Sequence, residues 1–266
     1  MEPVPGGYLS RHLEPEEHES ADASNSEDDY GLNHPLFDGV ETDYRKEQGF
    51  IFEKDGQSIE AQYLPFSRDE TDRMLLRLRS ARNEVDSPNL VELIEKMIKF
   101  YSTGAYNLEK LKIQKDENIL DIGGLAESVG ASIVFNPDIE CEVDSIEPSG
   151  RILSSGDIAN LSTVVKILHE LGHLERSGEE SVGARRRYLK RESITESEAE
   201  YILRSERDAW AFALTKIKPF LGKDQRGAVL NFIHRHSLSY YSDNIRKQIA
   251  PKWRLILPHL LESFSE

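Results

Sequence analysis

Hydrophobic and polar positions follow a period of two near the start of the chain and a helical period after it. Residues 46–66 alternate in this way on both sides of Asp55-Gly56. An aspartate–glycine pair between two alternating runs predicts a β-hairpin. Between about residues 69 and 83, apolar positions recur at helical spacing among several arginines. This pattern predicts a basic amphipathic helix.

Helices dominate the predicted elements of the rest of the chain. Pro88, with Ser87 before it as a cap, predicts the start of a helix that extends to about residue 108. Two short apolar runs, 132–135 and 150–154, predict strands. Further helices are predicted over residues 160–174, 192–217, 224–237 and 253–264. Together these elements predict an α+β fold that is mainly helical.

One motif in the helix over 160–174 carries candidate chemistry. The sequence HELGH occupies residues 169–173 and is an HExxH pattern. Residues four apart lie one turn apart on the same face of a helix, so both imidazoles can bind one metal ion. Glu170 lies beside them and can accept a proton from water held there. Zinc hydrolases use this combination of two histidine ligands and a carboxylate base.

The apolar surroundings of the motif strengthen this interpretation. Val164, Leu168 and Leu171 recur at helical spacing, so the helix should be buried. A polar group that is buried without a partner costs about 1–3 kcal/mol, and a metal ion removes that cost. The alternative is structural: two core histidines bonded to backbone carbonyls, with Glu170 in a surface ion pair.

A catalytic zinc site needs a third protein ligand, and the helix over 192–217 offers several carboxylates. Glu206 has apolar neighbours three and four residues away on both sides, so it projects from a face that should be buried. Asp208 lies on a mixed face, and the earlier glutamates lie on a polar one. Glu206 is therefore the predicted third ligand, with Asp208 and Glu198 as the alternatives.

The two motifs together resemble the ImmA/IrrE-type zinc metallopeptidases, a gluzincin-like family. In that family HExxH is followed by a helix of the form E-x-x-A-x-x-F-A, which Glu206, Ala209, Phe212 and Ala213 match here. The resemblance covers about residues 88–217. It implies a small zincin-like domain with an active-site helix, a short sheet that edges the cleft and a second ligand-bearing helix.

The resemblance also implies roles for the site residues. His169, His173 and Glu206 would bind one Zn²⁺ ion, and Glu170 would be the catalytic base. The strand over 150–154 would edge the cleft and pair with an extended substrate. The implied activity is that of a zinc-dependent metallo-endopeptidase. Its substrate would be a protein or peptide, such as a transcriptional repressor or stress regulator, which makes it a selective regulatory protease.

Other classes of function keep the same site. In one, zinc only stabilises a non-proteolytic interaction protein, which would not need Glu170. In another, the chain is a zinc amidase that acts on small substrates in a deeper pocket. The lone Cys141 also raises peptide deformylase, whose third ligand is a cysteine. The glycine-rich segments of that family are missing, however, so Cys141 is interpreted as an ordinary strand or loop residue.

A metallopeptidase also needs a hydrogen-bond donor to the oxyanion that develops in the transition state. Histidine and tyrosine side chains in the second half of the chain can supply it, and the sequence does not choose among them. The candidates are His234, His236, Tyr240, Tyr241, Tyr188 and Tyr201.

Acidic residues are concentrated at the N-terminus of a chain whose net charge is −15. Residues 1–50 hold 13 acidic and 3 basic side chains, a net charge of −10. Because aliphatic residues are few, residues 1–45 are predicted to be a disordered acidic tail. The excess of acid argues against direct nucleic-acid binding. The basic cluster at 185–191 is interpreted as a solvated connector, or as a rim that attracts an acidic substrate or the tail.

Composition predicts a cytoplasmic enzyme that does not bind membranes. No apolar run approaches the roughly 18 residues of a membrane span. The N-terminus lacks the regions of a signal peptide, and one cysteine cannot form an intramolecular disulfide. The predicted domains are the tail over 1–45, a hairpin and helix extension over 46–85, the zincin-like domain over 86–217 and a helical C-terminal extension over 218–266.

Overall fold

The predicted hairpin begins a mixed β-sheet in the computed structural model of the protein. The structure describes residues 36–37, 49–85, 88–136, 144–145, 151–154, 157–189, 193–239 and 241–265. Strands β1 (Gly49–Lys54) and β2 (Gln57–Pro65) pair antiparallel. In the turn between them, Asp55 has a φ of 48° and Gly56 a φ of 77°. Two left-handed residues are what the favoured two-residue hairpin turn requires. The hairpin prediction is confirmed.

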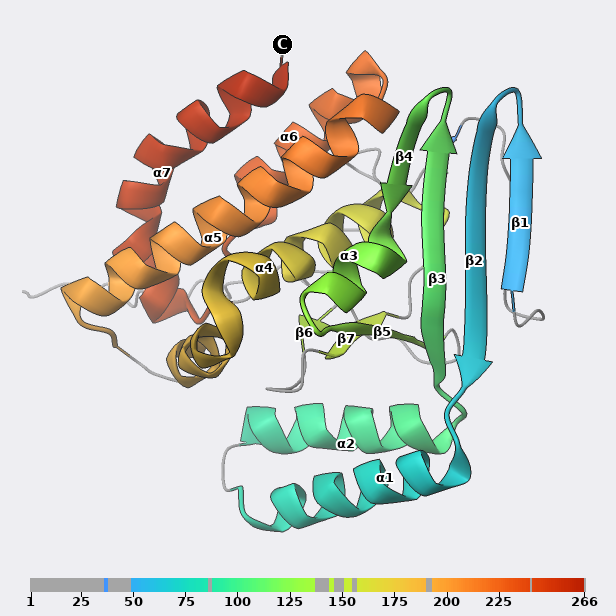
Figure 1. The fold of residues 1–266 in the computed structure, drawn as a ribbon. Coiled ribbons are helices and arrows are strands. Elements are labelled where there is room, and N and C mark those ends of the chain that lie inside the picture. Colours follow the sequence, from blue (N-terminus) through green and yellow to red (C-terminus); the bar gives the residue numbers. More distant parts are fainter. Residues whose placement is uncertain are drawn as a thin grey trace, which may run out of the picture.

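Seven strands of the described chain form the sheet, in the order β1-β2-β3-β5-β7-β6, with β4 beside β3 (Figure 1). The described strands after the hairpin are β3 (Tyr106–Lys115), β4 (Asn118–Asp121), β5 (Ser132–Phe135), β6 (Asp144–Ser145) and β7 (Arg151–Ser154). Strands β5 and β7 pair in parallel. The sequence predicts both of these, but the sheet is larger than the short one that it implies.

Strand β3 is the long strand that the hydrophobic pattern does not predict. Its sequence, YNLEKLKIQK, is rich in charged residues, and its buried side chains include Leu108, Leu111 and Ile113. The register between β2 and β3 shifts at Gln62, which leaves Glu109 as an extra residue on β3. Such a bulge turns Leu108 and Leu111 to the same face although they are three residues apart. The period of two is therefore broken.

The predicted helices are present, but several have different limits; the largest extension is that of the helix predicted over 160–174, which continues to Leu189. The described helices are α1 (Arg68–Asn83), α2 (Pro88–Ser102), α3 (Ile122–Ser128), α4 (Leu161–Leu189), α5 (Glu196–Ile217), the 3-10 turn η3 (Lys218–Phe220), α6 (Lys223–His236) and α7 (Asp243–Ser265). Helix α2 ends well before residue 108, and Gly104 follows it with a φ of 91°. Helix α7 begins before residue 253, because Ile245, Ile249 and Trp253 are buried at helical spacing.

Helices α4 and α5 lie between the sheet and the C-terminal helices, whereas α1 and α2 form a separate pair (Figure 1). One large hydrophobic cluster joins the sheet with α3 to α7, and a second joins α1 and α2. Ile59 and Tyr63 of the hairpin belong to the large cluster. The hairpin of the predicted extension therefore shares a core with most of the predicted zincin-like domain, whereas α1 packs with α2 in the second cluster. The fold is α+β and mostly helical, as predicted.

Leu36 and Phe37 lie in the core, although they fall within the predicted disordered tail. Both side chains are buried. The Leu36 N–H donates to the carbonyl of Ala159, and the Leu36 carbonyl accepts from Gln225 Nε2. The prediction of disorder is wrong at these two positions, because the two side chains bury apolar surface in the core and this burial offsets the entropy cost of ordering them. The rest of 1–45, Cys141 and residues 190–191 of the basic cluster lie outside the described residues, and the backbone of residues 185–189 belongs to a helix.

Strand β7 is paired on both sides, with β5 in parallel and with β6 antiparallel. The sequence predicts that this strand is an edge on which an extended substrate adds. That prediction is wrong, because Ile152 and Leu153 already pair with the two residues of β6. The edge of the described sheet on this side is β6.

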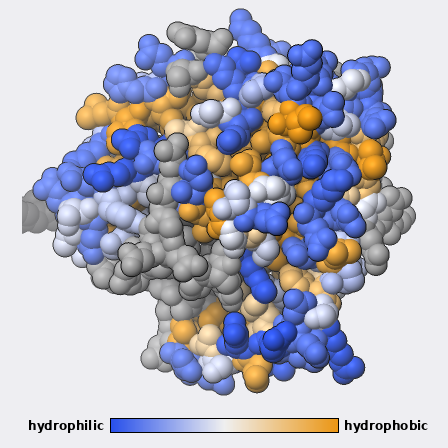
Figure 2. Space-filling model, in the orientation of Figure 1, coloured by the Kyte–Doolittle hydropathy of each residue, from blue (hydrophilic) through white to orange (hydrophobic). Residues whose placement is uncertain are grey.

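Hydrophilic side chains predominate on the face drawn in Figure 2, and a strip of hydrophobic ones lies between α7 and α5. Leu203, Leu255 and Ile256 help to line a hollow between these two helices. Among the described helices, none is both long enough and apolar enough to cross a membrane.

Candidate metal centre

The HExxH motif lies in the first half of α4, and the turns of the helix that precede it are buried. Val164 and Leu168 have no exposed surface. The helix therefore carries three polar residues into the core: His169, Glu170 and His173 are 4%, 3% and 2% exposed. An apolar helix that holds polar groups inside the protein is what the sequence pattern predicts.

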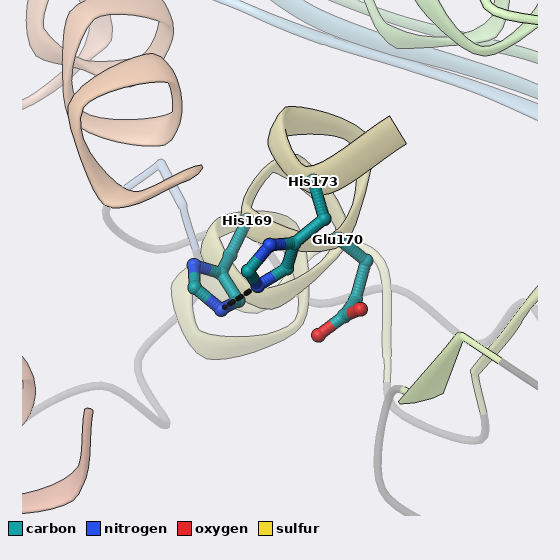
Figure 3. A group of neighbouring side chains, drawn as sticks. All are labelled: His169, Glu170 and His173. Carbon is teal, nitrogen blue, oxygen red and sulfur yellow. Dashed lines mark hydrogen bonds between the residues drawn. The ribbon is translucent and has the colours of Figure 1, made fainter. Parts of the chain in front are cut away.

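The two imidazoles project from consecutive turns of α4, with the Glu170 carboxylate beside them (Figure 3). The Nε2 atoms of His169 and His173 lie 3.1 Å apart, and their rings cross at 79°. One possible ligand atom from each of the three residues lies within 4.8 Å of the others. Two ring nitrogens that meet at one point can share one metal ion, so α4 alone provides a possible metal site of the zincin type.

Glu206 reaches the histidine pair from α5. Its side chain is 2% exposed. Its Oε2 lies 3.4 Å from His169 Nε2, and its Oε1 lies 3.6 Å from His173 Nε2. The three residues predicted as ligands thus come together from two helices, with the predicted base, Glu170, beside them.

The two alternative ligands have other partners. Glu198 belongs to the capping box that begins α5: its carboxylate accepts from the Thr195 N–H over 2.7 Å and from the Thr195 hydroxyl over 2.9 Å. Asp208 pairs with Arg207 over 2.6 Å at a partly exposed position. Both carboxylates are satisfied without a metal ion, which favours Glu206 as the third ligand.

The separations within this cluster fit a zinc ion. Zinc bonds of about 2.0–2.1 Å to nitrogen and oxygen place tetrahedral ligands about 3.3 Å from one another. The N–N separation here is 3.1 Å, and the two N–O separations are 3.4 and 3.6 Å. A divalent cation would also compensate the buried carboxylate of Glu206, whose desolvation is costly. The donor set, two imidazoles and a carboxylate, is one that zinc accepts.

Two hydroxyl groups orient the predicted ligands. Ser205 Oγ lies 3.0 Å from His173 Nδ1. If Nδ1 carries the proton and donates it to this hydroxyl, the Nε2 lone pair faces the cluster, as metal-binding histidines require. The Tyr241 hydroxyl donates to Glu206 Oε1 over 2.6 Å. Each of these contacts joins two different elements of the fold.

The ring of His169 is held by stacking. Trp210 lies against it, with ring centroids 3.9 Å apart and planes 30° apart. His169 Nδ1 has no hydrogen-bond partner among the described residues. An aromatic contact, and not a hydrogen bond to a described residue, therefore holds this side of the ring.

Gly172 allows α4 and α5 to approach closely. A Cβ atom at Gly172 would lie 2.8 Å from the carbonyl oxygen and 2.9 Å from the Cα of Ala209. Real Cβ atoms do not approach backbone this closely, so glycine is required here for the observed packing. Ala209 lies one turn after Glu206, and the close approach brings Glu206 to the histidines.

Tyr241 is the predicted transition-state donor that contacts this cluster, through Glu206. The other predicted donors have other contacts. His234 lines a groove between α6 and α7, and His236 stacks on Phe232. Tyr201 packs against Tyr188, and Tyr240 lies outside the described residues. Sequence reasoning missed Ser205. Its contact with α4 depends on how two helices pack, and its place one residue before Glu206 is the only signal that the sequence offers.

No protein-family profile, curated protein or solved structure matches this chain. The resemblance to the ImmA/IrrE-type metallopeptidases therefore rests on HExxH and on the helix that carries Glu206. The geometry by itself supports a buried His–Glu–His group that can hold a metal ion.

Proposed function

We propose that the protein is a zinc-dependent metallo-endopeptidase in which His169, His173 and Glu206 bind one Zn²⁺ ion. The observation that carries this proposal is the convergence of these three buried side chains beside Glu170. A site that only stabilised the fold would need no additional carboxylate there. When bound, zinc supplies Lewis-acid chemistry, because it acidifies water and polarises the carbonyl group of a peptide bond.

Glu170 is the proposed general base. It follows His169 directly, and its carboxylate lies beside the imidazole pair (Figure 3). In the proposed reaction this carboxylate accepts a proton from the attacking water and delivers it to the amine that leaves. Its burial excludes bulk water from the proton transfer.

Ser205 and Tyr241 are positioning residues in this proposal. The Ser205 hydroxyl holds the ring orientation of His173 and can accept the Nδ1 proton, which leaves Nε2 for the metal. The Tyr241 hydroxyl fixes one oxygen of Glu206. Both act through the residues that they contact, so their loss should weaken the site without removing a ligand.

The proposed substrate is a protein, such as a transcriptional repressor or a stress regulator. The resemblance supports this part of the proposal. One rival, a non-proteolytic protein that zinc stabilises, is favoured by a specific observation: the four side chains of the cluster are only 2–4% exposed. A catalytic zinc needs a fourth position open to water, whereas a structural one does not.

Metal analysis tests the site. We expect one zinc per chain in the wild type and in Glu170→Gln, and none in His169→Ala or Glu206→Ala. Glu200→Gln is the matched control, because Glu200 is an exposed glutamate on the same helix as Glu206, and it should retain zinc. A folded wild type that binds no zinc even after zinc addition would refute the metal site.

Cleavage of a peptide library, analysed by mass spectrometry, separates the enzyme from its rival. The zinc-loaded wild type should produce cleavages that Glu170→Gln does not, because only the proton acceptor differs between them. No cleavage by either zinc-loaded protein would assign zinc to a structural role, and equal cleavage by both would exclude Glu170 as the base.

A further inference from the structure

A basic groove with a volume of about 570 Å³ lies between α6 and α7. Arg235, Arg246 and Arg254 line it together with His234, and none of the described residues that line it is acidic. Arg246 also pairs with Asp243 at the surface. In a chain with a net charge of −15, this concentration of cations favours an anionic ligand.

The floor of the groove is apolar and fixed. Trp253 and Leu257 are buried there. Trp253 Nε1 donates to Ser237 Oγ over 2.8 Å, which ties α7 to the end of α6. A ligand that matches both the rim and the floor combines carboxylates with an aromatic or aliphatic side chain.

The N-terminal part of the chain lies within reach of this groove. The Leu36 carbonyl accepts a hydrogen bond from Gln225 in the first turn of α6. Arg235 lies ten residues further along that helix, a distance of about 15 Å. Residues 27–32 precede Leu36 by four to nine positions. An extended chain covers about 3.3 Å per residue, so these residues can lie about 13–30 Å from Leu36.

The sequence of this segment matches the groove. Glu27, Asp28 and Asp29 are followed by Tyr30 and, two residues later, Leu32. We propose that residues 27–32 of the chain itself dock in the groove between α6 and α7. The three carboxylates contact the arginines of the rim, and the tyrosine and leucine contact the apolar floor.

Hydrogen–deuterium exchange on the full-length protein tests this proposal. Backbone amides of residues 27–32 should exchange at least about tenfold more slowly than those of residues 14–19, an acidic stretch without tyrosine or leucine. Arg254→Glu should abolish this protection, and adding Asp28→Arg should restore part of it. Arg77→Glu reverses an exposed arginine on α1 and should leave the protection unchanged.

Three results would overturn the proposal. They are equal exchange rates in the two stretches, protection that survives Arg254→Glu, and protection that grows with protein concentration. The last result would assign the groove to the segment of a neighbouring copy. Because exchange reports neither zinc nor cleavage, this inference can fail while the proposed function stands, and the reverse also holds.

Discussion

Two helix pairs in this molecule differ in the side chains that form their contacts. Helices α1 and α2 meet through apolar side chains, among them Met74, Leu78 and Met97, and their charged residues stay at the surface. Helices α4 and α5 meet through a glycine that touches backbone, and they enclose histidine and glutamate side chains beside that contact.

The difference shows which constraint acts on each pair. Between α1 and α2 the side chains must fill the available volume, so other apolar residues of similar total volume would maintain the packing. In α4–α5 each buried polar atom depends on another, because an unsatisfied polar group in the core is costly. Substitutions should therefore affect stability alone in the first pair and metal binding in the second.

The largest expected effect on stability lies in the apolar pair. Phe100 is fully buried in the α1–α2 cluster, and Phe100→Ala should lower the free energy of unfolding by about 3–5 kcal/mol through lost burial and a cavity. Urea denaturation measures this loss, and metal analysis of the folded variant should still find one zinc. Loss of zinc from the folded variant would show that the two pairs are coupled.

Gly172→Ala tests the close approach of the second pair. The added Cβ meets the backbone of Ala209, so we expect a loss of about 1–3 kcal/mol in the free energy of unfolding. Gly227→Ala on α6 is the matched control. Its Cβ would meet nothing within 4 Å, and the change should stabilise that helix by about 0.5–1 kcal/mol. Equal effects of the two changes would contradict the packing account.

Tyr241→Phe should weaken zinc binding by about 10–100-fold, the usual effect of removing a group that orients a metal ligand. The substitution keeps the ring and deletes the hydroxyl that donates to Glu206. Competition with a chelator of known affinity measures the change. Tyr101→Phe, at a buried tyrosine of the α1–α2 cluster, should leave the affinity unchanged.

The smallest expected effect lies at the exposed start of α1. A hydrogen bond from the Ser67 hydroxyl and another from its backbone N–H lower the pKa of Glu70 below its ordinary value of 4.5. Glu70 therefore stabilises the fold above pH 4.5, and this stabilisation is lost as the pH falls through its lowered pKa. Denaturation of the wild type and Glu70→Gln should differ by about 0.5 kcal/mol or less near neutral pH. The difference should vanish in acid, and one that persists there would exclude the carboxylate as its cause.

Local periodicity is enough to predict which polar residues of the candidate site are buried. His169, His173 and Glu206 each lie on a helix whose apolar neighbours reveal a buried face, so the spacing alone indicates which polar residues enter the core. Strand β3 was missed because a bulge at Glu109 breaks its alternation. The contacts of Ser205 and Tyr241 join separate elements, and no local pattern encodes how helices dock.

Leu36 and Phe37 show a second reason why a prediction from sequence fails, which is that composition is averaged over a segment. Their acidic surroundings predict disorder, yet two adjacent apolar residues are enough to anchor the chain against the residues that precede α4. Averaging charge and hydropathy over a long segment hides a pair of this kind.

The stacking of Trp210 on His169 gives the candidate centre an optical reporter. The chain has two tryptophans, and the other, Trp253, is fixed by Ser237 in the C-terminal helices. Coordination of a cation by His169 would change the charge of a ring that lies against the indole of Trp210. Occupancy of the site should therefore alter the intrinsic fluorescence of the unlabelled protein, and Trp253 provides an internal reference.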